Sequence, residues 1–257
     1  MLQLLKTRFG QGRRTIDFPG EQTLPGRFRG LPVLRPELCR NGCSACAEAC
    51  PTEAIQTSPL KLDLGRCLFC GLCQQACPEG AITFTDRYPL SFRTRGAMVL
   101  DGREVELATA LDARMRSLFG RSLRLRHVAA GDCSGCAAEL AALGNVVFDL
   151  GRFGIQFVAS PRHADGLVIS GPVTANMRFA LQQAYEATPA PKIVIAVGAC
   201  ALSGGPFRGA AHSSDGVPPE IPVDLYIAGC PPHPLSLLDG MLRLLGRIDT
   251  NERRPAR

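Results

Sequence analysis

The sequence has no tryptophan and only three tyrosines, and aromatic residues make up 6% of its 257 positions. Few side chains are therefore available to stack on nucleic-acid bases. Basic residues are concentrated in residues 1–36, where seven Lys or Arg accompany Asp17 and Glu21, but they stand singly among Gly, Pro and Phe. No motif of a nucleic-acid reader is present among them. We expect no nucleic-acid partner.

Long apolar runs are also missing, since none reaches the roughly 18 to 20 residues that cross a membrane. Residues 1–9 lack both the long apolar stretch and the small-residue cleavage site of a secretion signal. We therefore expect a globular cytoplasmic protein, and 46% hydrophobic residues suffice for a sizeable core. In a reducing compartment, twelve cysteines predict metal binding rather than disulfides.

The pattern along the chain predicts five segments. Residues 1–30 read as an extended basic arm, rich in Gly, Pro and Arg, that lies along a partner subunit. Residues 31–90 hold eight cysteines, and residues 91–122 form a connecting segment with an amphipathic helix over Glu104 to Phe119. Residues 123–247 form a second domain. Residues 248–257 are a charged tail, which we expect to be disordered or laid on a partner.

A block of three cysteines, the last of which is followed by proline, occurs twice in the first domain. Residues 43–55 and 70–82 share the pattern Cys-x2-Cys-x3-Cys-Pro-x2-Ala-Ile at an offset of 27 residues. An internal repeat of this kind indicates two similar structural units.

The second copy, with Cys67 before it, matches the cysteine run of bacterial ferredoxins, in which three thiolates bind one 4Fe-4S cluster and the fourth crosses to another. Between Cys39 and Cys43 there are three residues instead of the usual two, a widening that Gly42 makes sterically easy. The sequence therefore predicts two interlocked clusters, one held by Cys67, Cys70, Cys73 and Cys50, and the other by Cys39, Cys43, Cys46 and Cys77.

Structural zinc is the alternative for these eight cysteines, because they could also make two sites of four thiolates. Zinc sites usually consist of CxxC pairs separated by a longer stretch, which the three-cysteine run fits poorly. Small residues beside the ligands allow backbone amides to approach the sulfurs and influence the reduction potential. We expect an electron-transfer segment with a bacterial-ferredoxin-like α+β fold.

From residue 123 onward, short apolar runs alternate with helical patterns, which predicts a parallel sheet covered on both faces. This second domain is expected to be a small, doubly wound, flavodoxin-like α/β unit. The predicted strands are Leu125 to Ala129, Phe157 to Ala159, Leu167 to Ser170, Ile193 to Val197 and Leu225 to Ala228, and the predicted helices are Ser134 to Leu143, Asn176 to Ala187 and Leu235 to Leu245.

The last four cysteines follow predicted strands, although they lie far apart in the sequence. Cys133 and Cys136 form one CxxC pair, and Cys200 and Cys230 stand in separate loops beside glycines and prolines. The carboxyl ends of parallel strands share one edge of a sheet, where ligands collect. We therefore predict that these four thiolates hold a third 4Fe-4S cluster, with free loop cysteines as the alternative.

Residues 124–245 resemble the cluster-bearing small subunits of membrane-associated, energy-converting NiFe hydrogenases of the formate hydrogenlyase type. That family is homologous to the 20-kDa-type subunit of complex I. The matching motifs are Cys133-x2-Cys136-x2-Glu139, Arg152-Phe153-Gly154-Ile155, Ser160 to Asp165, Gly171-Pro172-Val173-Thr174, Gly198-x-Cys200 and Gly229-Cys230-Pro231-Pro232. Complex I subunits usually have two adjacent cysteines at the first position, so the CxxC form favours the hydrogenase branch.

The resemblance implies that the third cluster lies beside the NiFe site of a separate large subunit, and that this chain passes electrons between that site and a donor or acceptor protein. It also implies other partner subunits and a peripheral place on the inner face of the cytoplasmic membrane. The runner-up is a complex I-like quinone or other reductase without nickel. No residue is predicted to be catalytic, and no nucleotide cofactor is implied.

Three further residues stay open between two interpretations. Glu139 could relay protons or tune the third cluster, or it could be a carboxylate favoured at the start of a helix. Arg162 and His163 could influence the cluster from a distance, or they could belong to a turn stabilised by Pro161 and Asp165. His212 and His233 are expected to pack in loops rather than bind metal.

Overall fold

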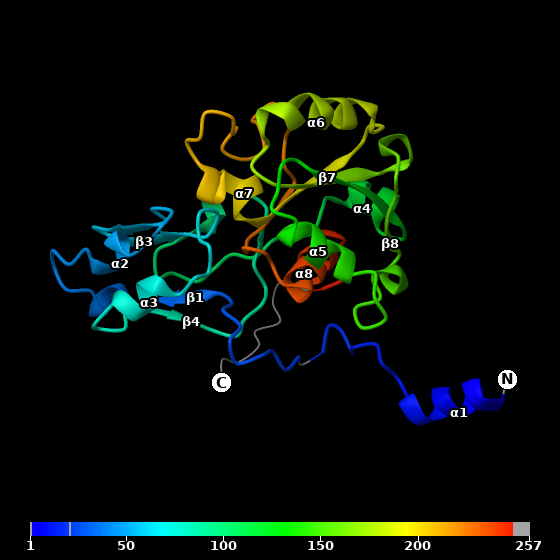
Figure 1. Ribbon diagram of the computed structural model, residues 1–257, viewed down its shortest axis with the longest axis horizontal. Helices are drawn as coiled ribbons and strands as arrows, with labels where there is room; N and C mark the ends of the chain where they lie inside the picture. The colour runs from blue at the N-terminus through cyan, green and yellow to red at the C-terminus, as the bar shows by residue number, and fades with distance from the viewer. Residues whose placement is uncertain (1, 21, 249–257) are drawn as a thin grey trace.

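The computed structural model describes residues 2–20 and 22–248 in two adjoining parts and a projecting N-terminal helix (Figure 1). Residues 31–90 supply most of the smaller part, and residues 113–248 supply most of the larger α/β part. The predicted tail of residues 248–257 lies outside the described residues except for Ile248.

The larger part is built on a six-stranded sheet with the order β5-β11-β10-β9-β7-β8. Five strands are parallel, and β5 at the edge runs antiparallel to β11. Counted along the chain, the parallel strands have the order 2-1-3-4-5, which is the flavodoxin-like arrangement and confirms the predicted fold class. The strands are β5 (Ser91–Phe92), β7 (Leu123–Ala129), β8 (Ile155–Phe157), β9 (Gly166–Ser170), β10 (Ile193–Val197) and β11 (Leu225–Ile227).

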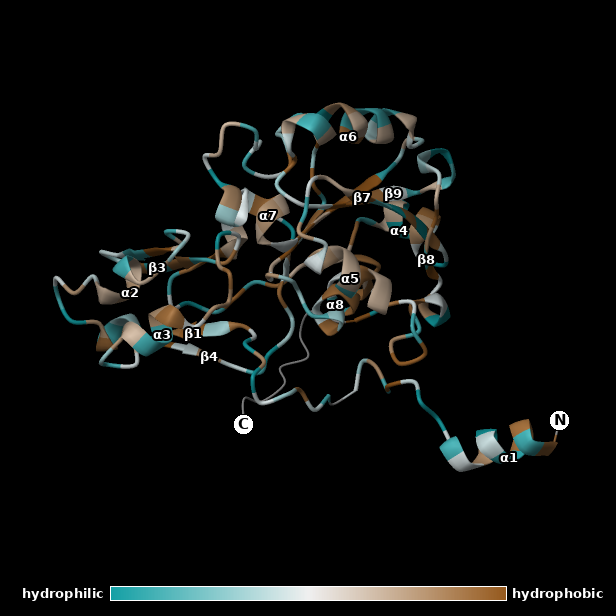
Figure 2. Cartoon of the chain, in the orientation of Figure 1, coloured by the Kyte–Doolittle hydropathy of each residue, from teal (hydrophilic) through white to brown (hydrophobic). Residues whose placement is uncertain are grey.

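Helices cover both faces of this sheet (Figure 1). On one face, Leu181 of α6 (Ala175–Ala187) is buried with Leu167 and Ile169 of β9. Alternate side chains point the other way, so Val168 packs with the core under the remaining helices. Those are α4 (Ala113–Phe119), α5 (Gly135–Ala142) and α8 (Pro234–Leu244). Hydrophobic residues are concentrated in α8 (Figure 2).

The smaller part has two short sheets and two one-turn helices. Its strands β1 and β4 pair with Leu34 opposite Ile82, and β2, β3 and β6 form the second sheet. Each helix begins inside one copy of the sequence repeat, as expected for a ferredoxin-like domain. The elements are β1 (Pro32–Leu34), α2 (Ala45–Glu48), β2 (Ile55–Thr57), β3 (Leu60–Asp63), α3 (Leu72–Ala76), β4 (Ile82–Phe84) and β6 (Val99–Leu100).

Residues 91–122 contribute to both parts of the molecule. Strand β5 joins the large sheet, and β6 then returns to pair with β3 of the smaller part. The helix expected over Glu104 to Phe119 is α4, which starts only at Ala113, where the Asp112 side chain accepts the amide of Met115. The preceding residues are not helical because their backbone forms hydrogen bonds with other segments. For example, Ala108 N donates to Ser91 O at 2.8 Å. That part of the prediction was wrong.

The N-terminal arm also differs from the expected extended segment, because α1 (Leu2–Gln11) is a helix with no buried residue. Residues 2–9 contain neither Gly nor Pro and are rich in good helix formers. The arm after α1 lies on this chain's own α/β part: Ile16 N donates to Val147 O at 3.0 Å, and the buried Phe18 packs near Tyr88 with ring centroids 6.0 Å apart.

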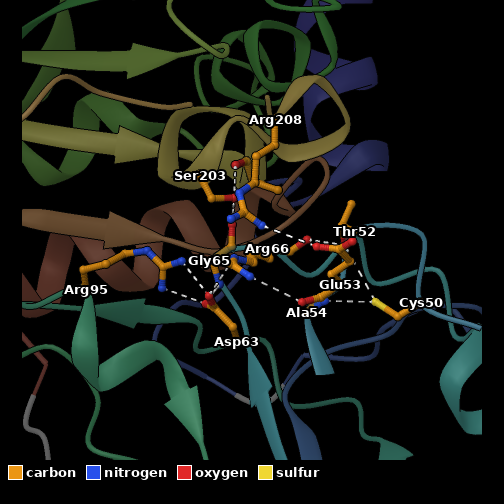
Figure 3. A network of polar contacts seen from close by, with 11 residues as sticks. Cys50, Thr52, Glu53, Ala54, Asp63, Gly65, Arg66, Arg95, Ser203 and Arg208 are labelled. Atoms are coloured by element: carbon orange, nitrogen blue, oxygen red, sulfur yellow. Dashed lines mark hydrogen bonds and ion pairs between the residues drawn. The ribbon is translucent and has the colours of Figure 1, made fainter. Parts of the chain in front are cut away.

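The two parts share a continuous hydrophobic core and a polar network. Leu62 and Met98 of the smaller part are buried in one cluster with Leu202 of α7 (Gly198–Ser203). In the network, the Ser203 hydroxyl donates to the Gly65 carbonyl at 2.8 Å (Figure 3). None of the helices formed by the described residues is long and apolar enough to cross a membrane.

Candidate iron-sulfur sites

The two copies of the sequence repeat hold their last cysteine in the same way. The amide of Ala54 donates to Cys50 Sγ at 3.2 Å, and the amide of Ala81 donates to Cys77 Sγ at 3.3 Å. Both bonds span four residues across the Cys-Pro turn. Hydrogen bonds from amides to thiolates stabilise negative charge on sulfur and influence the potential of a bound cluster.

The middle site, defined as Cys50, Cys67, Cys70 and Cys73, surrounds a cavity that these four cysteines line together with Thr52, Gly71 and several apolar side chains. The pKa of Cys67 is raised to about 12 and that of Cys73 to about 11, mainly by burial and in smaller part by the charge of Cys50. Thiols in such surroundings ionise when a metal centre coordinates them. Phe69 N also donates to Cys67 Sγ at 3.3 Å.

The outer site is defined as Cys39, Cys43, Cys46 and Cys77. Burial raises the pKa of Cys46, and the charges of Cys77 and Cys39 raise it further, so these three cysteines lie within electrostatic reach of one another. Gly42 adopts φ 76°, the left-handed conformation that the widened loop before Cys43 requires.

The third site, defined as Cys133, Cys136, Cys200 and Cys230, lies at the carboxyl edge of the large sheet. Its cysteines come from the segments that follow β7, β10 and β11. The pKa of Cys136 is raised to about 12, mainly by burial and in smaller part by the charges of Cys200, Cys230 and Cys133. The structure therefore brings together four thiols from three separate stretches of sequence.

Gly198, the first residue of α7, is packed against the third site. A Cβ built on it would lie 2.5 Å from Cys136 Sγ, and its φ of 83° is left-handed. Glycine is required there both by the backbone conformation and by the close approach of the sulfur.

The three sites form a continuous series. In addition to burial, the charge of Cys46 in the outer site raises the pKa of Cys73 in the middle site, and the charge of Cys70 in the middle site raises the pKa of Cys230 in the third. The middle site therefore lies within electrostatic reach of both of the others.

A 4Fe-4S cluster suits the middle cavity because its walls combine four cysteines with apolar side chains and a sulfur-directed amide. Nowhere in residues 2–20 and 22–248 do three or more His, Cys, Asp or Glu side chains converge on one shared metal-ion position. Thiolates on a cluster bind different irons, so they stand farther apart than the ligands of a single ion. The ligand assignments themselves stay predictions.

Glu139, Arg162 and His163 occupy different parts of the structure. Burial raises the pKa of Glu139, which is half-buried on α5 beside the third site. Arg162 and His163 are exposed in the turn before β9, at the amino edge of the sheet and opposite the third site. In that turn Asp165 Oδ2 accepts the amide of Arg124 at 2.7 Å, which favours the turn interpretation.

The two remaining histidines differ in their surroundings. His233 is half-buried and caps α8 by accepting the amide of Leu235, and burial lowers its pKa. His212 is exposed. Both places agree with loop packing.

A polar chain beside the third site was not foreseen. The buried Ser170 hydroxyl donates to Asp132 Oδ2 at 2.5 Å, and His127 Nε2 lies 2.8 Å from the same hydroxyl. The single Ser170 proton is engaged, so His127 donates in turn. The charge of Asp132 also raises the pKa of Cys136. The position of Asp132 directly before Cys133 was the available signal in the sequence.

Known proteins resemble both parts of the chain. Residues 133–244 match the family of the NADH ubiquinone oxidoreductase 20 Kd subunit, and residues 38–81 match the 4Fe-4S dicluster domain. A probable membrane-bound hydrogenase subunit mbhJ of Pyrococcus furiosus is 40% identical over 136 residues, which cover 53% of this chain and 81% of the relative.

Two further relatives are matched over smaller shares of their length. Formate hydrogenlyase subunit 7 of Escherichia coli is 40% identical over 144 residues, 56% of each chain. A subunit of the NADH-quinone oxidoreductase of Heliobacterium modesticaldum is 48% identical over 114 residues, 44% of this chain and 65% of the relative. The chain belongs to the family of the 20 kDa subunit of NADH ubiquinone oxidoreductase and hydrogenases, an oxidoreductase family, and carries a 4Fe-4S dicluster domain before it.

Proposed function

We propose that this chain is the electron-transfer subunit of a multi-subunit NiFe hydrogenase complex. Three 4Fe-4S clusters, bound at the outer, middle and third sites, would each accept and release single electrons. The chain thereby connects a donor or acceptor protein with the NiFe site of a separate large subunit. The twelve cysteines are the proposed ligands, and no residue of this chain is proposed to be catalytic.

The observation that carries the proposal is the continuity of the three sites. The charge of Cys46 acts on the pKa of Cys73, and that of Cys70 on the pKa of Cys230, so each site lies within electrostatic reach of the next. The shared core and the Ser203 to Gly65 bond fix the two parts against each other. A fixed and short separation between redox centres is what electron transfer requires.

Other residues of the chain donate hydrogen bonds to cysteine sulfurs and shield several of them from solvent. Backbone amides of Ala54, Phe69 and Ala81 donate to the sulfurs of three different cysteines. Cys46, Cys67, Cys73, Cys136 and Cys200 are buried, whereas Cys70, Cys133 and Cys230 are exposed. The exposed cysteines leave the middle and third sites open toward a docking partner.

Two observations support the hydrogenase branch. The first thiol pair of the third site has the CxxC spacing of the hydrogenases, Cys133 to Cys136. Relatives whose names include a membrane-bound hydrogenase and a formate hydrogenlyase are each 40% identical to this chain. We also propose that the chain works in a hetero-oligomer at the inner face of the cytoplasmic membrane, as a peripheral subunit.

The experiment is to purify the tagged chain with its native partners and to measure metal, sulfide and hydrogen exchange. We expect about twelve irons per chain, nickel in the large subunit and several interacting 4Fe-4S signals in electron paramagnetic resonance (EPR) spectra of the reduced complex. Iron without nickel and without hydrogen exchange would exclude the hydrogenase. A colourless complex that contains zinc would exclude electron transfer as a whole.

The second candidate is the corresponding subunit of a complex I-like reductase that reduces quinone or another substrate without nickel. The 48% identity to a subunit of an NADH-quinone oxidoreductase supports it. The sequence of the large-subunit partner distinguishes the two, because terminal CxxC pairs are the nickel ligands expected by the resemblance. A partner that lacks those pairs would favour the reductase.

A further inference from the structure

The N-terminal arm passes the junction between the middle and third sites, because Phe28 contacts His233 and Arg29 contacts Gly71. Phe28 attaches the arm on the side of the third site. The Phe28 ring packs edge-on against His233, with ring centroids 5.5 Å apart, and His233 follows Cys230 by three residues. The next residue of the arm, Arg29, therefore lies beside this junction.

Arg29 packs directly on the wall of the middle site. A Cβ built on Gly71 would lie 2.7 Å from Arg29 Nε and 3.2 Å from its Cζ, so the guanidinium rests on the Gly71 backbone. Gly71 follows Cys70 immediately and lines the same cavity as the four cysteines of that site. Its φ of 80° is left-handed, which agrees with the missing side chain that allows this close approach.

Backbone hydrogen bonds also fix the two residues that follow Arg29. Gly30 N donates to Thr85 O at 2.7 Å, and Leu31 N donates to Arg87 O at 2.8 Å. A Cβ on Gly30 would lie only 2.1 Å from Arg87 O, which shows how closely the arm approaches this segment. The backbone of Arg29 is thus positioned from both sides, next to the wall of the middle site.

We propose that Arg29 raises the reduction potential of the middle cluster, an inference that rests on the proposed function. Reduction adds one negative charge to a cluster, and a nearby positive charge stabilises the reduced form more than the oxidised form. The guanidinium is a permanent cation and supplies that charge without a proton-transfer step.

The test compares three variants by redox titration followed by EPR. In Arg29→Gln we expect the equilibrium constant for reduction of the middle cluster to fall about three- to tenfold, where tenfold corresponds to 59 mV for one electron. Arg29→Lys keeps the charge and should retain most of the potential. Arg8→Gln removes the same charge from the projecting helix α1 and should leave all three potentials unchanged (Figure 1).

The middle cluster is identified as the signal lost in Cys67→Ser. Full cluster content with an unchanged potential in Arg29→Gln would overturn the inference while leaving the proposed function intact. An equal shift in Arg8→Gln, or a shift confined to another cluster, would also overturn it. If the wild-type protein showed no iron-sulfur signal, the proposed function would fail and this inference with it.

Discussion

The hydroxyl of Ser203 donates a 2.8 Å hydrogen bond to the carbonyl of Gly65 and so joins the two parts of the chain that contain the proposed cluster sites (Figure 3). Ser203 ends the helix that carries Cys200, and Gly65 stands two residues before Cys67. One buried bond therefore connects the segment of the third site with that of the middle site.

Replacing this hydroxyl should weaken the junction. In Ser203→Ala the Gly65 carbonyl loses its partner, and we expect unfolding to require about 1–3 kcal/mol less free energy. The matched control is Ser236→Ala, because the buried Ser236 hydroxyl has no partner among the described residues. The melting temperature followed by circular dichroism should fall in the first variant and stay constant in the second. Equal melting temperatures for the two variants would show that the bond contributes nothing.

Cys39 provides a test of the outer site, because its spacing departs from the ferredoxin run. In Cys39→Ser we expect the loss of one cluster, about four irons per chain, with the middle and third sites still loaded. The control Arg40→Gln changes the adjacent residue, whose exposed side chain pairs with Glu79, and should keep all its iron. Iron analysis and EPR provide the measurement. Full iron content and an unchanged spectrum in Cys39→Ser would remove this cysteine from the ligand set.

Gly198 provides the corresponding test of the third site. Ala at this position would place its Cβ 2.5 Å from Cys136 Sγ, so we expect the third cluster to be lost or strongly perturbed. Gly209→Ala is the matched control, because Gly209 has a similar φ of 74° but nothing within 4 Å of the added carbon. Both variants carry about 1–3 kcal/mol of backbone strain, and only the first has the clash. Identical EPR spectra for the two would contradict the proposed packing.

His127 should make stability depend on pH. Burial lowers its pKa, Arg126 lowers it further, and the charge of Asp132 opposes the shift. As pH falls through about 6.5, His127 is therefore protonated in the unfolded chain before it is protonated in the folded protein. The free energy of unfolding then decreases by up to about 1.4 kcal/mol per pH unit, until His127 of the folded protein is protonated as well. Burial of His233 acts in the same direction.

The pH dependence can be isolated with His127→Gln, which keeps a hydrogen-bonding group toward Ser170. Melting temperatures at pH 7.5 and 5.5 should differ less in this variant than in the wild type. His212→Gln, at an exposed position, should retain the wild-type difference. A variant that responds to pH as strongly as the wild type would show that His127 makes no contribution.

The sheet and the family were predictable because their signals are local. Buried parallel strands are short apolar runs, so Ile193–Val197 was predicted to the residue, and the order of the strands confirmed the flavodoxin-like class. The helix that ends at Phe119 was predicted too long, because the helical spacing of apolar residues contains no information about the backbone hydrogen bond from Ala108 to Ser91. A competing backbone partner from another strand overrides helical spacing.

Cysteine spacing alone determined which thiols of residues 39–77 belong to a ferredoxin-type segment, since neighbouring ligands of one cluster must lie within a few residues of each other. Tertiary structure alone decided that the middle site lies within electrostatic reach of both of the others, and that Arg29 rests on Gly71. These contacts join residues far apart in sequence. They depend on strand order and on how the arm and the two parts pack, which no local pattern encodes.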